Sequence, residues 1–278
     1  MLKTYIPKSD QLRKYVDFFY TFDKKNPCHV SYISFPHVNT GIAFFKNTSI
    51  TRLDNKVSMQ PLDIKAGALN TYSIEIVGKV TEPLFIQYQG NVQELSIIFK
   101  PLGINHFLKE NFSSIAPNFS QEYINAEWLV FAPLLFKEES EESQISLLES
   151  FLLKKIQTHD LTSMYKAIEY LEDVANELSI QEIASILRMN LKTFQRRFYK
   201  HLACTPSDYR RIFKFRASLN SGLLSKDLRN LTTLTYESNY YDQSYFVREY
   251  RKLTRLNPKA FFNKISVLND QKIIWEVK

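Results

Sequence analysis

The 278-residue sequence predicts an α+β protein of two domains, a β-rich N-terminal domain with helices and an all-α C-terminal domain. Three observations support this class. The chain is longer than a typical single domain. Short β-branched and aromatic runs, which are typical of strands, are concentrated in residues 1–125. Beyond residue 125 the apolar residues recur at the three-to-four spacing of helices. We expect one domain over residues 1–157 and a second over residues 162–266.

The strands of the first domain are predicted from three runs bounded by Gly, Pro or Asn, namely Ile42–Phe45, Tyr72–Val77 and Leu95–Phe99. Short strands at this spacing favour a small barrel or sandwich. The segment 12–19 is either an amphipathic helix or a strand, because its pattern fits both.

Two helices are expected to close the first domain, at residues 127–137 and 142–157. The second begins with acids and ends with lysines, as the helix dipole favours. Its apolar face consists of Ile145, Leu148, Leu152 and Ile156. That face either packs on its own domain or forms a dimer seam. Residues 157–160 are the best candidate for a linker, and everything after them is expected to be helical.

The positive charge of the chain is concentrated in its second part. Residues 1–159 contain equal numbers of basic and acidic residues, whereas residues 188–264 contain 17 basic and 5 acidic ones. A local excess of this size indicates an anionic polymer as the partner.

Several other classes of protein are excluded by the composition. No apolar run reaches the ~18 residues of a membrane span, so no membrane partner is expected. The first seven residues lack the apolar core of a signal peptide. The only cysteines, Cys28 and Cys204, are too few for a disulfide framework or a thiolate-rich zinc site. We therefore expect a reducing, cytoplasmic location.

The strongest motif is an internal repeat with an offset of 52 residues. Residues 194–200, Phe-Gln-Arg-Arg-Phe-Tyr-Lys, are matched by residues 246–252, Phe-Val-Arg-Glu-Tyr-Arg-Lys. Each copy continues with a capping residue, a Pro and an aromatic residue: Thr205, Pro206 and Tyr209 in the first, and Asn257, Pro258 and Phe261 in the second. A repeat of this kind indicates two copies of one supersecondary unit.

Each copy is predicted to contain a helix, a tight turn and a second helix. In the first copy Ser179 and Glu182 form a capping box, and Asn190 can cap the second helix. In the second copy Asn230 and Asp242 can cap the two helices. Two short helices at a tight turn form a helix-turn-helix unit, whose second helix fits the major groove of DNA.

Residues 163–264 resemble the DNA-binding domain of the AraC/XylS family of bacterial transcription regulators. The resemblance rests on residues 178–184, 194–200, 240–246 and 258–261. It implies two helix-turn-helix units joined by a long helix, and two recognition helices in adjacent major-groove segments of double-stranded promoter DNA. The residues implied to face bases or phosphates are Lys192, Thr193, Gln195, Arg196 and Lys200 in the first unit, and Gln243, Ser244, Tyr245 and Arg248 in the second.

The sequence departs from the family in its two turns. The family usually has Gly there, where φ is often positive, and here Arg188 and Asn239 take its place. The second unit is expected to bind DNA more weakly, because Glu249 would lie near phosphates. On this reasoning Arg196→Ala should damage DNA binding more than Arg248→Ala.

Residues 1–125 resemble the β-rich, cupin-like domains that precede this DNA-binding module. The likeness rests on Pro7, Leu12, Tyr15-Val16 and Phe18, and on residues 99–103. It implies that the domain senses a small molecule, dimerises, or both. RNA polymerase and a second copy of the chain are the further partners that the resemblance implies.

No catalytic site, cofactor or metal site is expected. Cupin metal sites need closely paired histidines, which His29 and His37 are not, and no second Cys/His pair complements Cys28-His29. No Gly-rich phosphate loop or nucleophile triad is present. The aromatic residues of the domain are interpreted as core: Phe35, Phe44, Phe45, Phe85, Tyr88 and Phe99.

Two alternatives to a ligand-sensing regulator remain open. An enzyme or repair protein with an appended DNA-binding domain, such as a methyl acceptor, would need reactive or zinc-bound cysteines in the first domain. A regulator without an effector would have a fully packed barrel. A pocket with both apolar and convergent polar groups would favour the sensor.

Overall fold

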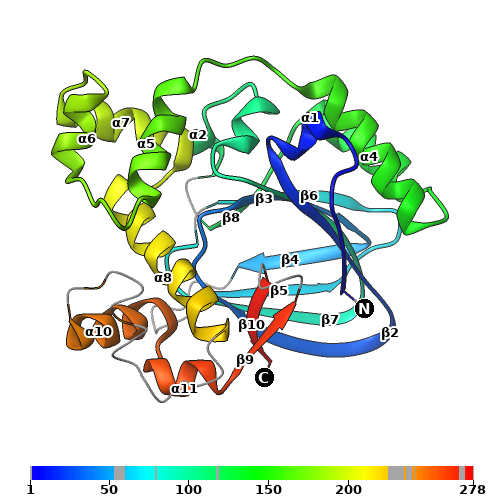
Figure 1. The fold of residues 1–278 in the computed structure, drawn as a ribbon. Coiled ribbons are helices and arrows are strands. Elements are labelled where there is room, and N and C mark those ends of the chain that lie inside the picture. The colour runs from blue at the N-terminus through cyan, green and yellow to red at the C-terminus, as the bar shows by residue number, and fades with distance from the viewer. Residues whose placement is uncertain are drawn as a thin grey trace.

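A computed structural model describes residues 2–52, 60–78, 80–116, 119–224, 235, 240, 242–268 and 273–277. A β-rich N-terminal part is followed by a helical part that lies beside it (Figure 1). The predicted α+β class is confirmed. Among the helices of the described residues, none combines the length and the apolar character needed to cross a membrane.

The N-terminal strands form one sheet around two long strands that pair along most of their length. The long strands are β2 (Val16–Ser34) and β7 (Leu84–Phe99). The shorter strands are β1 (Leu2–Tyr5), β3 (Thr40–Lys46), β4 (Thr48–Arg52), β5 (Gln60–Ala66), β6 (Tyr72–Val77) and β8 (Ser120–Glu122). The three runs that were predicted as strands lie in β3, β6 and β7, which confirms them.

A bend in the two long strands divides the sheet into two halves. The β2–β7 register shifts between Lys24 and Cys28, opposite Gly90, whose φ is 81°. Such a shift bends a strand, and glycine adopts a positive φ without strain. Beyond the bend in one direction β7 pairs with β3, and in the other direction it pairs with β5.

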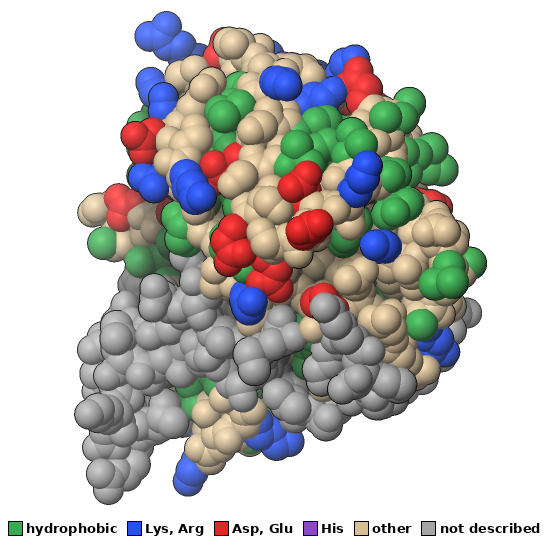
Figure 2. All heavy atoms as spheres, turned by 90° about the vertical axis from the view of Figure 1, so that its right-hand side faces the viewer, with side chains coloured by type: hydrophobic (Ala, Val, Ile, Leu, Met, Phe, Trp, Pro, Cys, Tyr) green, Lys and Arg blue, Asp and Glu red, His purple; other side chains and the backbone are tan. Residues whose placement is uncertain are grey.

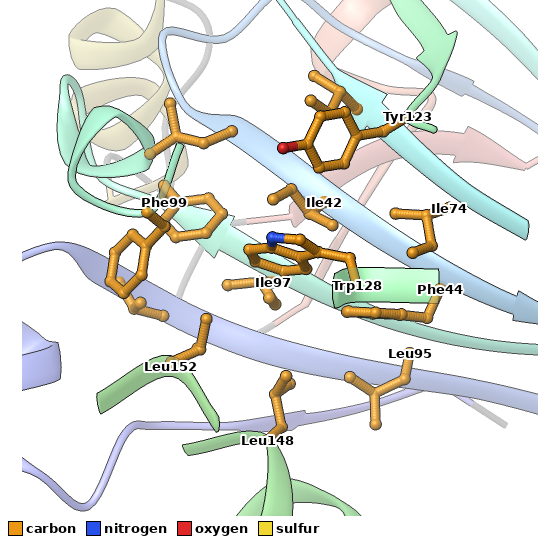
Figure 3. Packing of buried hydrophobic residues seen from close by; sticks show 14 of the residues in the cluster. Ile42, Phe44, Ile74, Leu95, Ile97, Phe99, Tyr123, Trp128, Leu148 and Leu152 are labelled. Carbon is orange, nitrogen blue, oxygen red and sulfur yellow. The ribbon is translucent and has the colours of Figure 1, made fainter. Parts of the chain in front are cut away.

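Short helices cover one face of the sheet (Figure 1). They are α1 (Asp10–Arg13), a 3₁₀ turn (Gly103–His106), α2 (Phe112–Ile115), α3 (Ala126–Leu135) and α4 (Glu141–Lys155). Trp128 of α3 lies among apolar side chains of β3, β6 and β7 (Figure 3). Its ring is nearly parallel to that of Phe44, with the ring centroids 5.9 Å apart. The predicted helices at 127–137 and 142–157 are confirmed to within two residues at each end. The ambiguous segment 12–19 contains the end of α1 and the start of β2.

The apolar face of α4 is buried against its own domain. Ile145, Leu148 and Leu152 are each at most 3 % exposed and belong to the cluster around Trp128. The alternative that this face forms a dimer seam is therefore wrong, because the domain itself covers it.

The two segments that carried the N-terminal resemblance are in direct contact. The amide of Lys100 donates to the carbonyl of Tyr15 at 2.9 Å. A Cβ atom at Gly103 would lie 2.1 Å from the same carbonyl oxygen. Only glycine allows the backbone at position 103 to come this close to the Tyr15 carbonyl, which explains why the second segment ends in Gly103.

The C-terminal part contains α5 (Thr162–Glu172), α6 (Ile180–Ile186), α7 (Leu191–Leu202), α8 (Pro206–Leu224), α10 (Gln243–Thr254) and α11 (Pro258–Phe262). The prediction that everything after the linker is helical is wrong. The chain continues into β9 (Ile265–Leu268) and β10 (Ile273–Val277), which form an antiparallel pair. Strand β10 also pairs with β2 at Tyr32–Ser34, so the end of the helical part returns to the N-terminal sheet.

Side chains also connect the two parts. Phe35 from the N-terminal part packs with Phe215 and Phe261 in one buried cluster. Near α7, the Asn105 amide donates to the His201 carbonyl at 3.0 Å, and Asn105 Oδ1 lies 3.1 Å from His201 Nδ1. The helical part is therefore packed on the sheet domain at several points.

Candidate nucleic-acid interface and cavity

The first helix-turn-helix unit consists of α6 and α7. Ser179 Oγ accepts from the amide of Glu182 at 3.2 Å, and the Glu182 carboxylate accepts from the amide of Ser179 at 2.7 Å. Asn190 Oδ1 accepts from the amide of Thr193 at 2.8 Å, so it caps α7. The predicted capping box and the predicted cap are both confirmed.

The second unit contains α10 as its second helix. Asp242 Oδ1 accepts from the amide of Tyr245 at 2.6 Å and caps α10, as predicted. Asn257 Oδ1 caps α11 in the same way, through the amide of Ala260 at 2.9 Å. The predicted first helix of this unit, with Asn230, Leu231 and Leu234, and the turn residue Asn239 lie outside the described residues.

The aromatic residues of the repeat pack in the same way in both copies. Phe194, Phe198 and Tyr209 are at most 1 % exposed, and so are Phe246, Tyr250 and Phe261. The Phe198 and Tyr209 rings are 5.7 Å apart at 84°, and those of Tyr250 and Phe261 are 5.6 Å apart at 78°. The 52-residue repeat therefore corresponds to a repeated core.

The turn of the first unit has the positive φ that the family resemblance implied. Arg188 has φ 55° and an exposed side chain. Its amide donates to the Ser185 carbonyl at 2.9 Å, and the amide of Met189 donates to the Ala184 carbonyl at 2.9 Å. These backbone bonds hold an arginine in the left-handed region.

The predicted DNA-facing residues lie on the outward sides of α7 and α10. All are exposed except Thr193, which is half-buried: Lys192, Gln195, Arg196 and Lys200 on α7, and Gln243, Ser244, Tyr245 and Arg248 on α10. The guanidinium of Arg248 lies 5.9 Å from the centre of the Tyr245 ring, a cation–π distance.

The prediction that Glu249 would lie near phosphates is wrong. Glu249 is 2 % exposed and points inward. One carboxylate oxygen accepts from Lys252 Nζ at 3.0 Å, and the other lies 4.0 Å from Arg211 Nε on α8. Helix α7 contains no acid, so both helices present only positive and neutral side chains to solvent. A different face of the molecule, viewed from the right-hand side of Figure 1, carries both signs of charge (Figure 2).

Helix α8 separates the two recognition helices. Helices α7 and α10 lie near its opposite ends (Figure 1). Its 19 residues span about 28 Å at 1.5 Å per residue. This length is close to the ~34 Å that separates successive major-groove segments on one face of DNA.

A cavity of about 510 Å³ lies inside the N-terminal sheet. Its wall includes Ala43 and Phe45 from one half of the sheet and Ile64 and Ile86 from the other. Phe44 and Phe99 belong to the core on the opposite face, as interpreted. Phe35, Phe45 and Tyr88 also belong to buried core clusters, as interpreted, and in addition they line the cavity.

Polar groups converge on the cavity around Glu94. Its carboxylate accepts hydrogen bonds from Tyr20, from Tyr88 at 2.5 Å and from Ser96 at 2.6 Å. Burial raises the pKa of Glu94, while these three hydroxyl donors act in the opposite direction. Burial and the nearby Glu94 raise the pKa of Tyr20 and Tyr88 well above the usual value.

Helix α8 forms part of the cavity wall through Phe213, Arg216 and Ala217. Burial lowers the pKa of His37, on the same wall, to about 4, and the charge of Arg216 acts in the same direction. The helix that joins the two DNA-binding units is therefore in contact with the space inside the sheet.

The described residues contain no group of three or more His, Cys, Asp or Glu side chains arranged to hold a metal ion. The side chains of Cys28 and His29 lie outside the described part of the structure.

Residues 183–264 match a helix-turn-helix domain family. This part of the chain is an AraC-type helix-turn-helix domain. Residues 3–120 match a domain family of unknown function, DUF6597. No curated protein matches the chain.

Solved structures with a similar fold include ToxT from Vibrio cholerae. In the 1.65 Å structure (P21 form) the match is 13 % identical, covers 88 % of this chain and 97 % of ToxT, and has a TM-score of 0.45. For wild-type ToxT of strain SCE256 with bound unsaturated fatty acid, the identity is 12 %, the coverage 87 % and 93 %, and the TM-score 0.46.

Proposed function

We propose that the chain is a sequence-specific regulator of transcription, in which residues 162–266 bind promoter DNA and residues 1–157 sense a small molecule. One observation carries the DNA-binding part: within the bounds of the two recognition helices, α7 and α10, the exposed side chains are positive or neutral. As a regulator it would act on RNA polymerase at the same promoter.

The side chains divide by chemistry into base-reading and phosphate-binding groups. Arg196 and Arg248 can bond bidentately to guanine O6 and N7, and Gln195 and Gln243 can bond to adenine. Lys200, near the end of α7, is suited to a phosphate. The remaining residues, which can bond to bases or phosphates, are Lys192, Thr193, Ser244 and Tyr245.

The cavity supports the sensing part of the proposal over a regulator without an effector. Its wall combines apolar side chains with convergent polar groups, as small-molecule sites do. Because α8 lines the cavity and joins the two units, a ligand that shifts α8 would change the spacing of the recognition helices.

The test uses the full chain and a DNA site recovered by genome-wide mapping of bound fragments. We expect binding at least ~10³-fold tighter than to a shuffled duplex of the same composition. Footprinting should show two protected major-groove segments about 10 base pairs apart. Equal affinity for the shuffled duplex would refute sequence-specific binding, and one protected segment would refute docking of both units.

A further inference from the structure

The side chains that line the cavity include more acidic than basic groups among the described residues. Among the described residues of the wall, Asp17, Glu75 and Glu94 are carboxylates and Arg216 is the one arginine. His37 is neutral near pH 7, because its pKa is lowered to about 4. The wall has no lysine among its described residues.

Within the part of the chain that the structure describes, Glu94 is buried without a cationic partner. It is 4 % exposed, and it accepts hydrogen bonds from the hydroxyls of Tyr20, Tyr88 and Ser96. Among the described residues, none places a Lys or Arg within salt-bridge distance of it. The groups that act on the pKa of Glu94 are its burial and these hydroxyls, whereas the charge of Arg216 acts on His37. A buried carboxylate costs free energy unless a positive charge compensates it.

The strand register places a second carboxylate on the same wall. Glu75, Ala43, Ser96 and Tyr20 are successive partners across β6, β3, β7 and β2. Ala43 and Ser96 are small, so the middle of this row stays open between Glu75 and Tyr20. Glu75 is 3 % exposed and accepts from Ser120 at 2.7 Å. Two buried carboxylates therefore border the open part of the cavity.

Tyrosine side chains lie beside Glu94, and two of them donate their hydroxyl groups to it. Tyr20, Tyr32 and Tyr88 all line the cavity, and the Tyr32 and Tyr88 rings lie nearly parallel at 6.0 Å. Tyrosine rings attract cations through their faces, and aromatic cages with carboxylates suit substituted ammonium groups. The rest of the wall is aliphatic, with Ile64, Ile86 and Val80, so it suits the apolar part of a ligand.

We infer that this cavity binds an apolar molecule that carries one positive charge, a substituted ammonium compound, with the charged group beside Glu94 and its tyrosines. The inference rests on the sensing part of the proposed function. The inference goes further than the sensing proposal, because it assigns a positive charge to the ligand.

The experiment is calorimetric titration of the full chain with three probes of equal alkyl length: octyltrimethylammonium, 1-octanol and octanoate, all below micelle formation. We expect the cation to bind at least ten-fold tighter than the alcohol, and octanoate to bind weakest. Glu94→Gln should weaken cation binding about ten-fold and change alcohol binding less than two-fold. Glu122→Gln, a matched change at an exposed position of β8, should change neither.

The ranking of the three probes is measured on the wild-type chain, so it decides the question even if Glu94→Gln does not fold. Glu75→Gln provides a second variant on the same wall. Equal or tighter binding of 1-octanol or octanoate would overturn the inference, and so would no binding of any probe. The DNA-binding proposal is tested separately with promoter DNA, and either result can fail without the other.

Discussion

Arg188 offers a direct test of the strain in the first turn. Its φ of 55° lies in the left-handed region, which costs a residue with a Cβ atom about 1–2 kcal/mol. Glycine avoids this cost but loses about 0.5–1 kcal/mol more backbone entropy on folding. The side chain is exposed, and the turn is held by backbone hydrogen bonds that glycine keeps. Arg188→Gly should therefore raise the free energy of unfolding by about 0.5–1 kcal/mol.

Arg197→Gly is the matched control, because it also removes one exposed arginine but lies inside α7. Glycine in a helix interior costs about 0.8–1 kcal/mol, so this variant should be destabilised. The two variants should differ by about 1.3–2 kcal/mol, or roughly 3–8 °C in unfolding midpoint. Scanning calorimetry and urea titration measure both. A lower midpoint for Arg188→Gly than for wild type would show that the positive φ is not a source of strain.

Three further predictions concern DNA binding and pH. The affinity for promoter DNA should fall steeply with salt, and Lys200→Ala should reduce the slope of log K against log salt by about 0.9; an unchanged slope would remove Lys200 from the phosphate contacts. Since the acid of α10 is buried, Arg196→Ala and Arg248→Ala should each cost about 1–3 kcal/mol of DNA binding, and a loss confined to Arg196 would mean that the second unit does not dock. Burial lowers the pKa of His37 and His201 to about 4, so the unfolded chain takes up protons at a higher pH than the folded chain does. The free energy of unfolding should therefore be highest above about pH 6.5 and fall toward pH 4, and the fall should be smaller in His201→Asn. A free energy of unfolding from urea titration that does not change over this pH range would contradict the prediction.

The helix-turn-helix units could be predicted because their signals are local. Ser179 and Asn190 cap amide groups only three residues away. The inward aromatic residues follow from helical spacing within one segment. The cavity could not be predicted in this way, because Tyr20 of β2 is far in sequence from Tyr88 and Glu94 of β7. Only the register of β2 against β7 brings them together.

Two sequence-based predictions were wrong although the sequence contained a local pattern that pointed the other way: the exposed position of Glu249 and the all-helical end of the chain. Glu249 is three residues after Phe246, so helical geometry places both on the same inward face. Residues 273–277, Ile-Ile-Trp-Glu-Val, form a β-branched and aromatic run of the kind that marks a strand. Neither pattern identifies the distant residues that pair with Glu249 or with the last strand. Arg211 on α8 and the edge of β2 supply those partners, and both lie far away in the sequence.

The pairing of β10 with β2 has a consequence for how the protein is made. Domains generally fold in order as the chain leaves the ribosome, yet the edge of β2 at Tyr32–Ser34 stays open until residues 273–277 have been synthesised. An open strand edge can pair with a neighbouring chain. A chain that ends directly after α11 would therefore contain both recognition helices and an unpaired strand edge on β2. We expect a chain that ends before β10 to self-associate through this edge.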